Sequence, residues 1–172
     1  MDRNDGYRRV KNPFLLNGGY MTRNIGLVLS VLLIAAVATL VGQQQQKPTV
    51  DVYKSATCGC CSKWVEHLQA NGFTVRTTNR DDLADLKAKH GVPGRVQSCH
   101  MAVVNGYVIE GHVPAADVQR LLKERPAVVG LAVPGMPIGS PGMEMPGRKA
   151  QPFDVLTFDK DGQTRVFASH GN

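Results

Sequence analysis

The segment Thr57–Ser62, which reads TCGCCS, constrains the fold of this chain more than any other feature. It holds three of the four cysteines, follows a strand-like segment over 49–54 and opens a helix-like segment over 63–71. Thiols at the start of a helix face unpaired backbone N–H groups and the positive end of the helix dipole, which favours the thiolate. Because the thiolate binds metals and attacks disulfides, the segment predicts a soft-metal site or a thiol redox site.

The spacing of these cysteines limits which disulfides they can form. Adjacent Cys60 and Cys61 cannot be bridged without severe strain, and a bridge from Cys58 to Cys60 is nearly as unfavourable. Cys58 and Cys61, in a C-x-x-C arrangement, are the only comfortable local pair. A domain of roughly 125 residues buries enough core without disulfides, so we do not expect a purely structural bridge.

The rest of the body alternates between strand-like and helix-like segments. Asn105-Gly106, between two short apolar runs, is the strongest short signal for a β-hairpin. The predicted elements are strand 49–54, helix 63–71, strand 73–78, a helix capped by Asp81 and ended by Gly91, strands 101–104 and 107–110, and helix 115–124. This order, β-α-β-α-β-β-α, predicts a thioredoxin-like α/β fold with a central mixed sheet flanked by helices.

Cys99 lies in the loop before the third predicted sheet strand of this fold, which reads QSCHM over 97–101. Thioredoxin-like folds normally place a cis-proline in this loop, against the C-x-x-C. A cysteine there would direct its sulfur toward the CGCC segment, and four converging sulfurs are more typical of a metal site than of a redox site. His100 and Met101 are strand neighbours, so only one is expected to face the site, with core packing as the alternative. His112, at the end of the next strand, is placed either to close the site from the side or to form a local hydrogen bond.

A Met-rich loop over 133–147, with the sequence VPGMPIGSPGMEMPG, follows the last predicted helix. Its proline and glycine content excludes a continuous helix or strand. Met136 and Met143 lie in this loop, and thioethers are soft neutral ligands that suit Cu(I) or Ag(I) but not Zn²⁺. The alternative is an ordinary linker with exposed methionines. A C-terminal β-hairpin over 153–168 completes the predicted domain.

The N-terminal part of the chain differs in composition from the body. Residues 1–47 hold six basic and two acidic side chains, whereas the body is nearly neutral, so no basic stripe for nucleic acid is expected. Ile25–Val41 is uncharged and apolar on every face, which indicates a signal peptide or a membrane anchor. The expected segments are 1–24, basic; 25–42, signal peptide or anchor; 43–48, linker; and 49–172, a thioredoxin-like metal-binding domain. A signal peptide and a membrane anchor would both export the domain, because the positive charge before the apolar segment stays on the cytoplasmic side.

Three stretches, ATCGCCSKWVEHL, GVPGRVQSCHMAVVNGYVIEGHVPAADVQRLL and GLAVPGMPIGSPGMEMPG, resemble the CopG-type copper- and silver-resistance proteins. These are periplasmic thioredoxin-like proteins, and the resemblance covers about residues 48–172. It implies binding of Cu(I), as a cluster of several ions, together with a redox role in copper handling. Other periplasmic copper-handling proteins are the expected partners, and a membrane contact is expected only through the N-terminal segment if it is uncleaved. The ligands that the resemblance implies are Cys58, Cys60, Cys61 and Cys99, followed by Met136, Met143 and His112.

The leading interpretation is therefore an exported protein of metal resistance that binds copper(I) or silver. The main alternative is a thiol–disulfide oxidoreductase with Cys58 as nucleophile and Cys61 as the resolving thiol. Cys60 argues against that alternative, because a third adjacent thiol invites mispairing, and so does the cysteine in the proline position. A four-cysteine Zn²⁺ or Fe–S site fits the ligand count but leaves the methionines unexplained. Whether the protein is an enzyme, either a copper-dependent or a thiol oxidoreductase, stays open.

Overall fold

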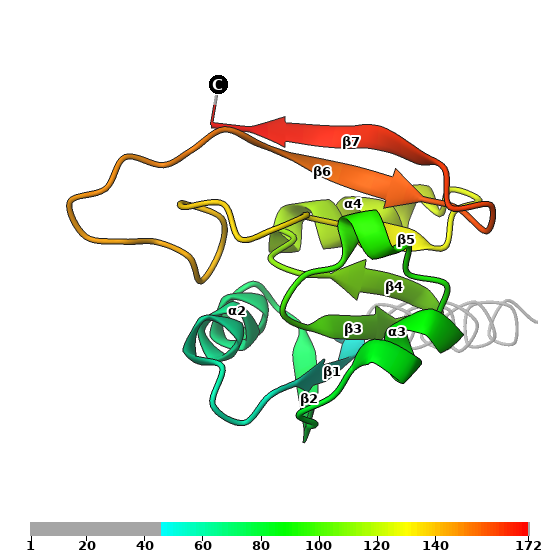
Figure 1. Cartoon of the computed structure of the whole chain (residues 1–172), viewed down its shortest axis with the longest axis horizontal. Coiled ribbons are helices and arrows are strands. Elements are labelled where there is room, and N and C mark those ends of the chain that lie inside the picture. Colours follow the sequence, from blue (N-terminus) through cyan, green and yellow to red (C-terminus); the bar gives the residue numbers. More distant parts are fainter. Residues whose placement is uncertain (1–45, 172) are drawn as a thin grey trace, which may run out of the picture. The chain divides into compact units, whose positions relative to one another are not determined.

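The computed structural model describes residues 46–171, so the predicted segments 1–24 and 25–42 and the first part of the 43–48 linker lie outside it. The described part is built on one seven-stranded mixed sheet in the order β2-β1-β3-β4-β5-β6-β7 (Figure 1). Its elements are β1 (Thr49–Lys54), α2 (Gly59–Ala70), β2 (Thr74–Asn79), α3 (Ala84–Lys89), the 3₁₀ helix η1 (Gly94–Val96), β3 (Met101–Val104), β4 (Tyr107–Glu110), α4 (Ala115–Glu124), β5 (Gly130–Ala132), β6 (Phe153–Phe158) and β7 (Thr164–His170). Within the described range, no helix is long and apolar enough to cross a membrane.

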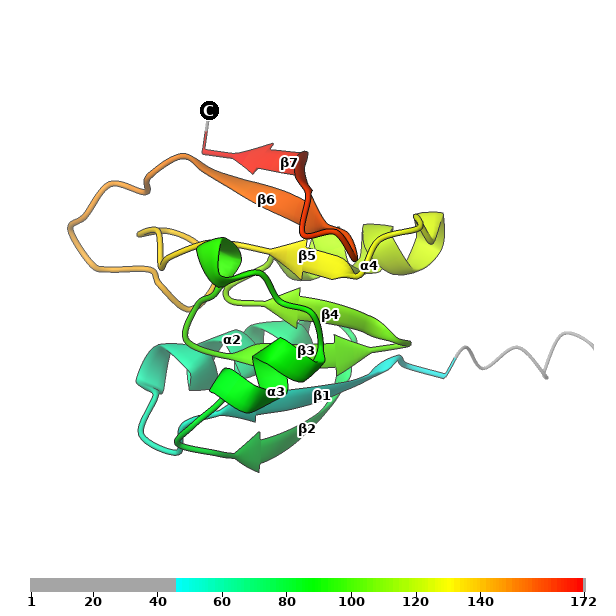
Figure 2. The same ribbon diagram turned by 45° about the vertical axis from the view of Figure 1, so that its right-hand side comes forward.

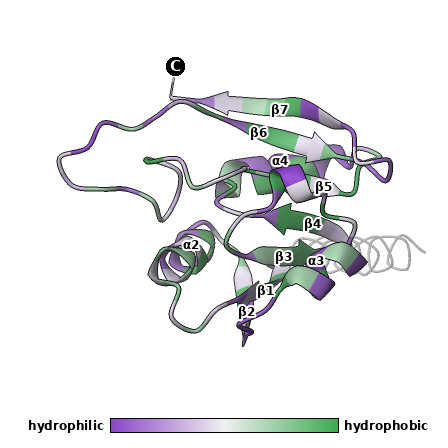
Figure 3. Ribbon diagram, viewed as in Figure 1, coloured by the Kyte–Doolittle hydropathy of each residue, from purple (hydrophilic) through white to green (hydrophobic). Residues whose placement is uncertain are grey.

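Helices cover both faces of the sheet, with α2 and α4 on one face and α3 on the other (Figure 2). Two hydrophobic clusters fill the layers between them. The α2 and α4 side includes Trp64, Leu68 and Leu121, whereas the α3 side includes Met101 and Phe158. Strand residues alternate between the two clusters, as the pleat of a sheet requires, and both central strands β3 and β4 are strongly hydrophobic (Figure 3).

The strand pairings confirm the predicted thioredoxin-like α/β fold. β1 runs parallel to β2 through the α2 crossover and antiparallel to β3. β3 and β4 form the predicted hairpin, in which Asn105 and Gly106 both have positive φ, at 47° and 86°. Those angles are typical of the tight turn that Asn-Gly favours. The Met-rich loop and the C-terminal hairpin of β6 and β7 are present as added features.

Two details of the predicted elements were wrong. The helix expected to be capped by Asp81 begins at Ala84, whose backbone N–H bonds to the carboxylate of Asp82 at 2.8 Å. The strand β5 was not predicted, because three residues carry too little pattern to be recognised. It pairs in parallel with β4 and antiparallel with β6, and so it attaches the C-terminal hairpin to the sheet.

Replacing Gly130 by alanine should destabilise the protein strongly, because β5 approaches β4 too closely for a side chain at this position. A Cβ on Gly130 would lie 1.9 Å from the carbonyl oxygen of Val108. We expect the free energy of unfolding to fall by about 3 kcal/mol in urea denaturation. Gly94→Ala is the control, since a Cβ there meets nothing within 4 Å. Equal stability of both variants would contradict the close approach.

Candidate metal centre

The first turn of α2 presents the three clustered cysteines. Cys58 is the N-cap residue of this helix, and Cys60 and Cys61 lie in its first turn, because the helix begins at Gly59, earlier than the predicted 63–71. Cys61 is fully buried, whereas Cys58 and Cys60 are half-buried. The three sulfurs therefore lie where the unpaired N–H groups of a helix gather.

Two of these cysteines are joined. A disulfide links Cys58 and Cys61, which is the pair that the spacing marked as the comfortable one. Cys60 and Cys99 keep free thiols. The Cys60 sulfur lies 3.5 Å from that of Cys58, so a free thiol contacts the disulfide directly.

Cys99 brings the fourth sulfur to the same place. The sulfur atoms of the four cysteines all lie within 4.8 Å of one another. The predicted meeting of the CGCC turn with the loop before β3 is thus present in the structure. Soft donors at this separation are suited to holding a metal ion in common.

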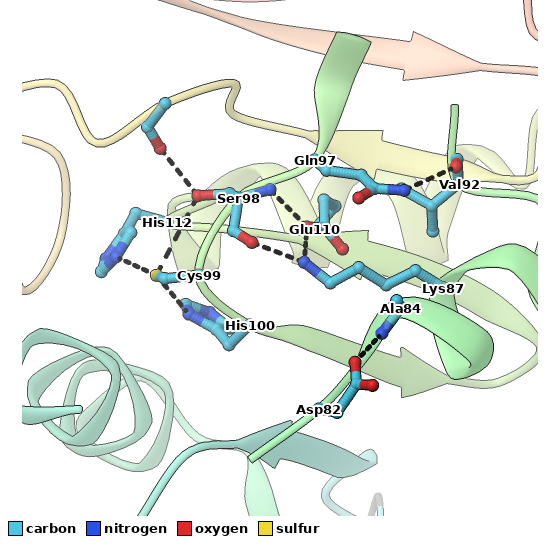
Figure 4. A network of polar contacts seen from close by, with 11 residues as sticks. Asp82, Ala84, Lys87, Val92, Gln97, Ser98, Cys99, His100, Glu110 and His112 are labelled. Atoms are coloured by element: carbon cyan, nitrogen blue, oxygen red, sulfur yellow. Dashed lines mark hydrogen bonds and ion pairs between the residues drawn. The ribbon is translucent and has the colours of Figure 1, made fainter. Parts of the chain in front are cut away.

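Two histidine rings contact the Cys99 sulfur (Figure 4). Nε2 of His112 lies 3.2 Å from it, and Nδ1 of His100 lies 3.3 Å from it. Both rings are fully buried, and they meet edge to face with 5.0 Å between their centroids. The sequence placed His112 either to close the site or to form a local hydrogen bond, and it left His100 between the core and the site. Met101 points the other way and is core, as the strand alternation allows.

Burial keeps Cys99 and the two histidines of this centre neutral. It raises the pKa of the Cys99 thiol to about 11, with the nearby Cys60 adding to the effect. It lowers the pKa of His100 to about 3 and also lowers the pKa of His112. At neutral pH the pair of imidazoles therefore has free lone pairs, and Cys99 carries its proton. A thiol of this kind is a poor nucleophile, but it can lose its proton to a bound metal ion.

A buried ion pair fixes the loop that carries Cys99 (Figure 4). Oε1 of Glu110 lies 2.6 Å from the Lys87 ammonium and accepts the backbone N–H of Ser98, also at 2.6 Å. Lys87 in turn donates to the Ser98 carbonyl at 2.5 Å. Burial raises the pKa of Glu110, while the hydrogen bond and charge of Lys87 and the Ser98 N–H act to lower it. Sequence reasoning missed this pair; the available signal was a carboxylate ending the apolar strand 107–110.

The Met-rich loop covers the start of α2. Gly142 has a φ of 85°, and a Cβ there would lie 2.7 Å from the Cys60 carbonyl oxygen, so the loop backbone packs directly on the helix. The predicted ligand Met136 is 51% exposed, and Met143 is half-buried. Met145, outside the predicted ligand set, is 48% exposed. The role of Met136 and Met143 as ligands stays a prediction.

Comparison with known proteins identifies close relatives of this arrangement. Two solved structures named copper resistance protein CopG, Form 1 and Form 2, are 46% and 45% identical to this chain. Each alignment covers 73% of this chain, with 100% and 99% of the solved chains and a TM-score of 0.68. Residues 96–143 match a family described as proteins of unknown function, DUF411, and this range contains Cys99 and His112. No curated protein sequence matches the chain.

Replacing Glu110 by glutamine should lower the free energy of unfolding by about 3–5 kcal/mol, because the Lys87 ammonium would stay buried without its counter-ion. The double variant Lys87→Met/Glu110→Gln should regain more than half of that loss, since it removes both charges. Urea denaturation of Glu110→Gln, Lys87→Met and the double variant measures the difference.

The exposed pair between Asp51 and Arg76 supplies the control for this experiment. Its side chains are 36% and 71% exposed, so Asp51→Asn should cost less than about 1 kcal/mol. A double variant in which the losses of Lys87→Met and Glu110→Gln simply add would contradict the coupling of the buried pair.

Proposed function

Because the chain belongs to the CopG family of copper-resistance proteins, we propose that it binds copper as Cu(I) through Cys58, Cys60, Cys61 and Cys99 in metal resistance and homeostasis. The observation that carries this proposal is the convergence of four sulfurs from two separate loops within 4.8 Å. Thiolate sulfur is a soft donor that favours Cu(I) over harder cations. Ag(I) has the same preference, so silver binding belongs to the proposal.

The donor set fits copper once the disulfide is reduced. Reduction of the Cys58–Cys61 bond by two electrons and two protons gives two thiols, which join those of Cys60 and Cys99. A thiolate can bridge two soft ions, and four neighbouring sulfurs allow several ions to be held as one cluster. Bound copper would displace the thiol protons, Cys99 included. Redox handling of copper is the further step of this proposal.

Other residues around the sulfurs would assist. His112 offers Nε2 beside Cys99, as the 3.2 Å contact between them allows. Met136 and Met143 would contribute thioethers from the loop that packs on α2. The exposure of Met136 suits it to meeting incoming copper before the buried sulfurs do.

Export completes the proposed function. Residues 25–42 would act as a signal peptide or membrane anchor and place residues 49–172 in the periplasm. Copper would then be exchanged there with other periplasmic copper-handling proteins. An exported site that lowers free copper would protect the cell without the ion entering the cytoplasm.

A second candidate function is thiol–disulfide exchange at Cys58 and Cys61. The observation that favours it is the disulfide between these two residues at the start of a helix, with Cys58 half-buried and Cys61 fully buried. A partner thiolate would attack the Cys58 sulfur, forming a mixed disulfide and releasing the Cys61 thiolate. Cys60, 3.5 Å from Cys58, would compete for that sulfur and weaken such an exchange.

Replacing Cys99 by serine should lower both the amount and the affinity of Cu(I) bound by the reduced protein. We expect more than one equivalent for the wild type, and at least a tenfold loss of affinity in the variant, because a hydroxyl is a poor Cu(I) ligand. Metal analysis and competition with a Cu(I) chelator measure both quantities. His90→Gln is the matched control, since His90 lies beside α3 and outside the centre. Unchanged binding in Cys99→Ser would remove Cys99 from the site.

The reduced protein should reduce insulin only slowly, because Cys60 competes with Cys58 for each mixed disulfide. Precipitation of the insulin B chain, followed by turbidity, measures this activity. Cys60→Ser should raise the rate if mispairing is the limit. Turnover of the wild type at the level of a thioredoxin would favour the second candidate over the first.

A further inference from the structure

The disulfide form of the centre retains a second set of donors. With Cys58 bonded to Cys61, the free thiol of Cys99 stands between the rings of His100 and His112 (Figure 4). One ligand atom from each of these three residues lies within 4.8 Å of the others. The free Cys60 sulfur is also within 4.8 Å of that of Cys99. These contacts do not require the disulfide to be opened.

His112 is already oriented as a ligand. Its Nδ1 lies 2.8 Å from the carbonyl oxygen of Pro141, which can only accept a hydrogen bond. Nδ1 therefore carries the ring proton, and Nε2 directs its lone pair toward the Cys99 sulfur at 3.2 Å. A backbone carbonyl that fixes the tautomer in this way is the usual outer contact of a metal-bound histidine.

His100 completes the set from the opposite side of the sulfur. Its ring is fully buried, and its Nε2 has no hydrogen-bond partner among the described residues. Nδ1 of the ring lies 3.3 Å from the Cys99 sulfur. The Trp64 ring packs against the imidazole, tilted by 43° with 4.4 Å between the ring centroids. A buried imidazole in contact with a thiol is well placed to share a metal ion with that thiol.

We propose that the disulfide form binds one divalent ion of borderline softness, such as Zn²⁺ or Co²⁺, through Cys99, His100 and His112. One sulfur and two imidazoles form a borderline donor set that suits Zn²⁺ with one position left open, whereas four thiolates suit Cu(I) better. Both modes use Cys99, so they exclude each other. The redox state of Cys58 and Cys61 then selects which ion the centre binds; this last step rests on the proposed function.

The test is a Co²⁺ titration of the full chain in its disulfide form, without oxygen, after a thiol assay has shown two free thiols per chain. We expect one equivalent to bind, with strong visible d–d bands of tetrahedral Co²⁺, a sulfur-to-cobalt charge-transfer band, and displacement of Co²⁺ by Zn²⁺. His112→Gln should weaken binding at least tenfold, whereas the control His90→Gln should leave it unchanged. Absence of the charge-transfer band, or equal affinity in His112→Gln, would overturn the proposal.

A second variant separates this inference from the proposed function. Cys58→Ser/Cys61→Ser keeps every donor of the divalent site but removes two of the four sulfurs proposed for Cu(I). It should bind Co²⁺ like the oxidised wild type and lose most of its Cu(I) when reduced. Oxidised wild type without bound Co²⁺, together with normal Cu(I) binding after reduction, would overturn only the divalent site. Co²⁺ binding without any Cu(I) binding would support it and contradict the copper proposal.

Discussion

The place of the Cys99 sulfur depends on the buried ion pair between Lys87 and Glu110. The loop before β3 has no hydrogen-bond ladder of its own at Ser98, and this pair satisfies both the N–H and the carbonyl of that residue. Lys87 comes from α3, which covers the sheet face opposite α2 (Figure 2). The centre therefore depends on both faces of the sheet. Helix α2 on one face carries three of the cysteines, and α3 on the other face holds the loop that carries Cys99.

The Met-rich loop adds further anchors to the same place. Ser98 donates its hydroxyl to the Gly135 carbonyl at 2.7 Å, and the Pro141 carbonyl holds His112. Gly142 packs on the first turn of α2, where a side chain would clash with the helix backbone. A segment without helix or strand is thus tied at several points to the loop, the strand end and the helix that carry the donors. Its order follows from these contacts rather than from any local pattern.

The sequence predicted the features that depend on a short stretch of residues or on the position of a loop in the fold. The strand–CGCC–helix pattern and the Asn105-Gly106 turn are local, and the place of Cys99 follows from the position of its loop in the fold. β5 is too short for a periodic signal and depends on pairing with β4, which is distant in sequence. Glu110 and its partner from α3 resemble solvated charges until the fold brings them together. His100 could not be assigned because alternation gives opposite faces to strand neighbours without saying which one meets the cysteines.

The pKa shifts around Cys99 favour a role for this thiol in metal binding over a role in thiol exchange. An exchanging thiol needs a lowered pKa, whereas burial raises the pKa of Cys99 to about 11. The surrounding imidazoles are held neutral by the same burial, so they cannot supply the positive charge that would stabilise a thiolate. A bound cation would supply that charge, and buried thiolates would lose their desolvation penalty by bonding to it. Without a cation Cys99 stays protonated and is a poor nucleophile, which is the behaviour expected of a thiol that serves as a metal ligand.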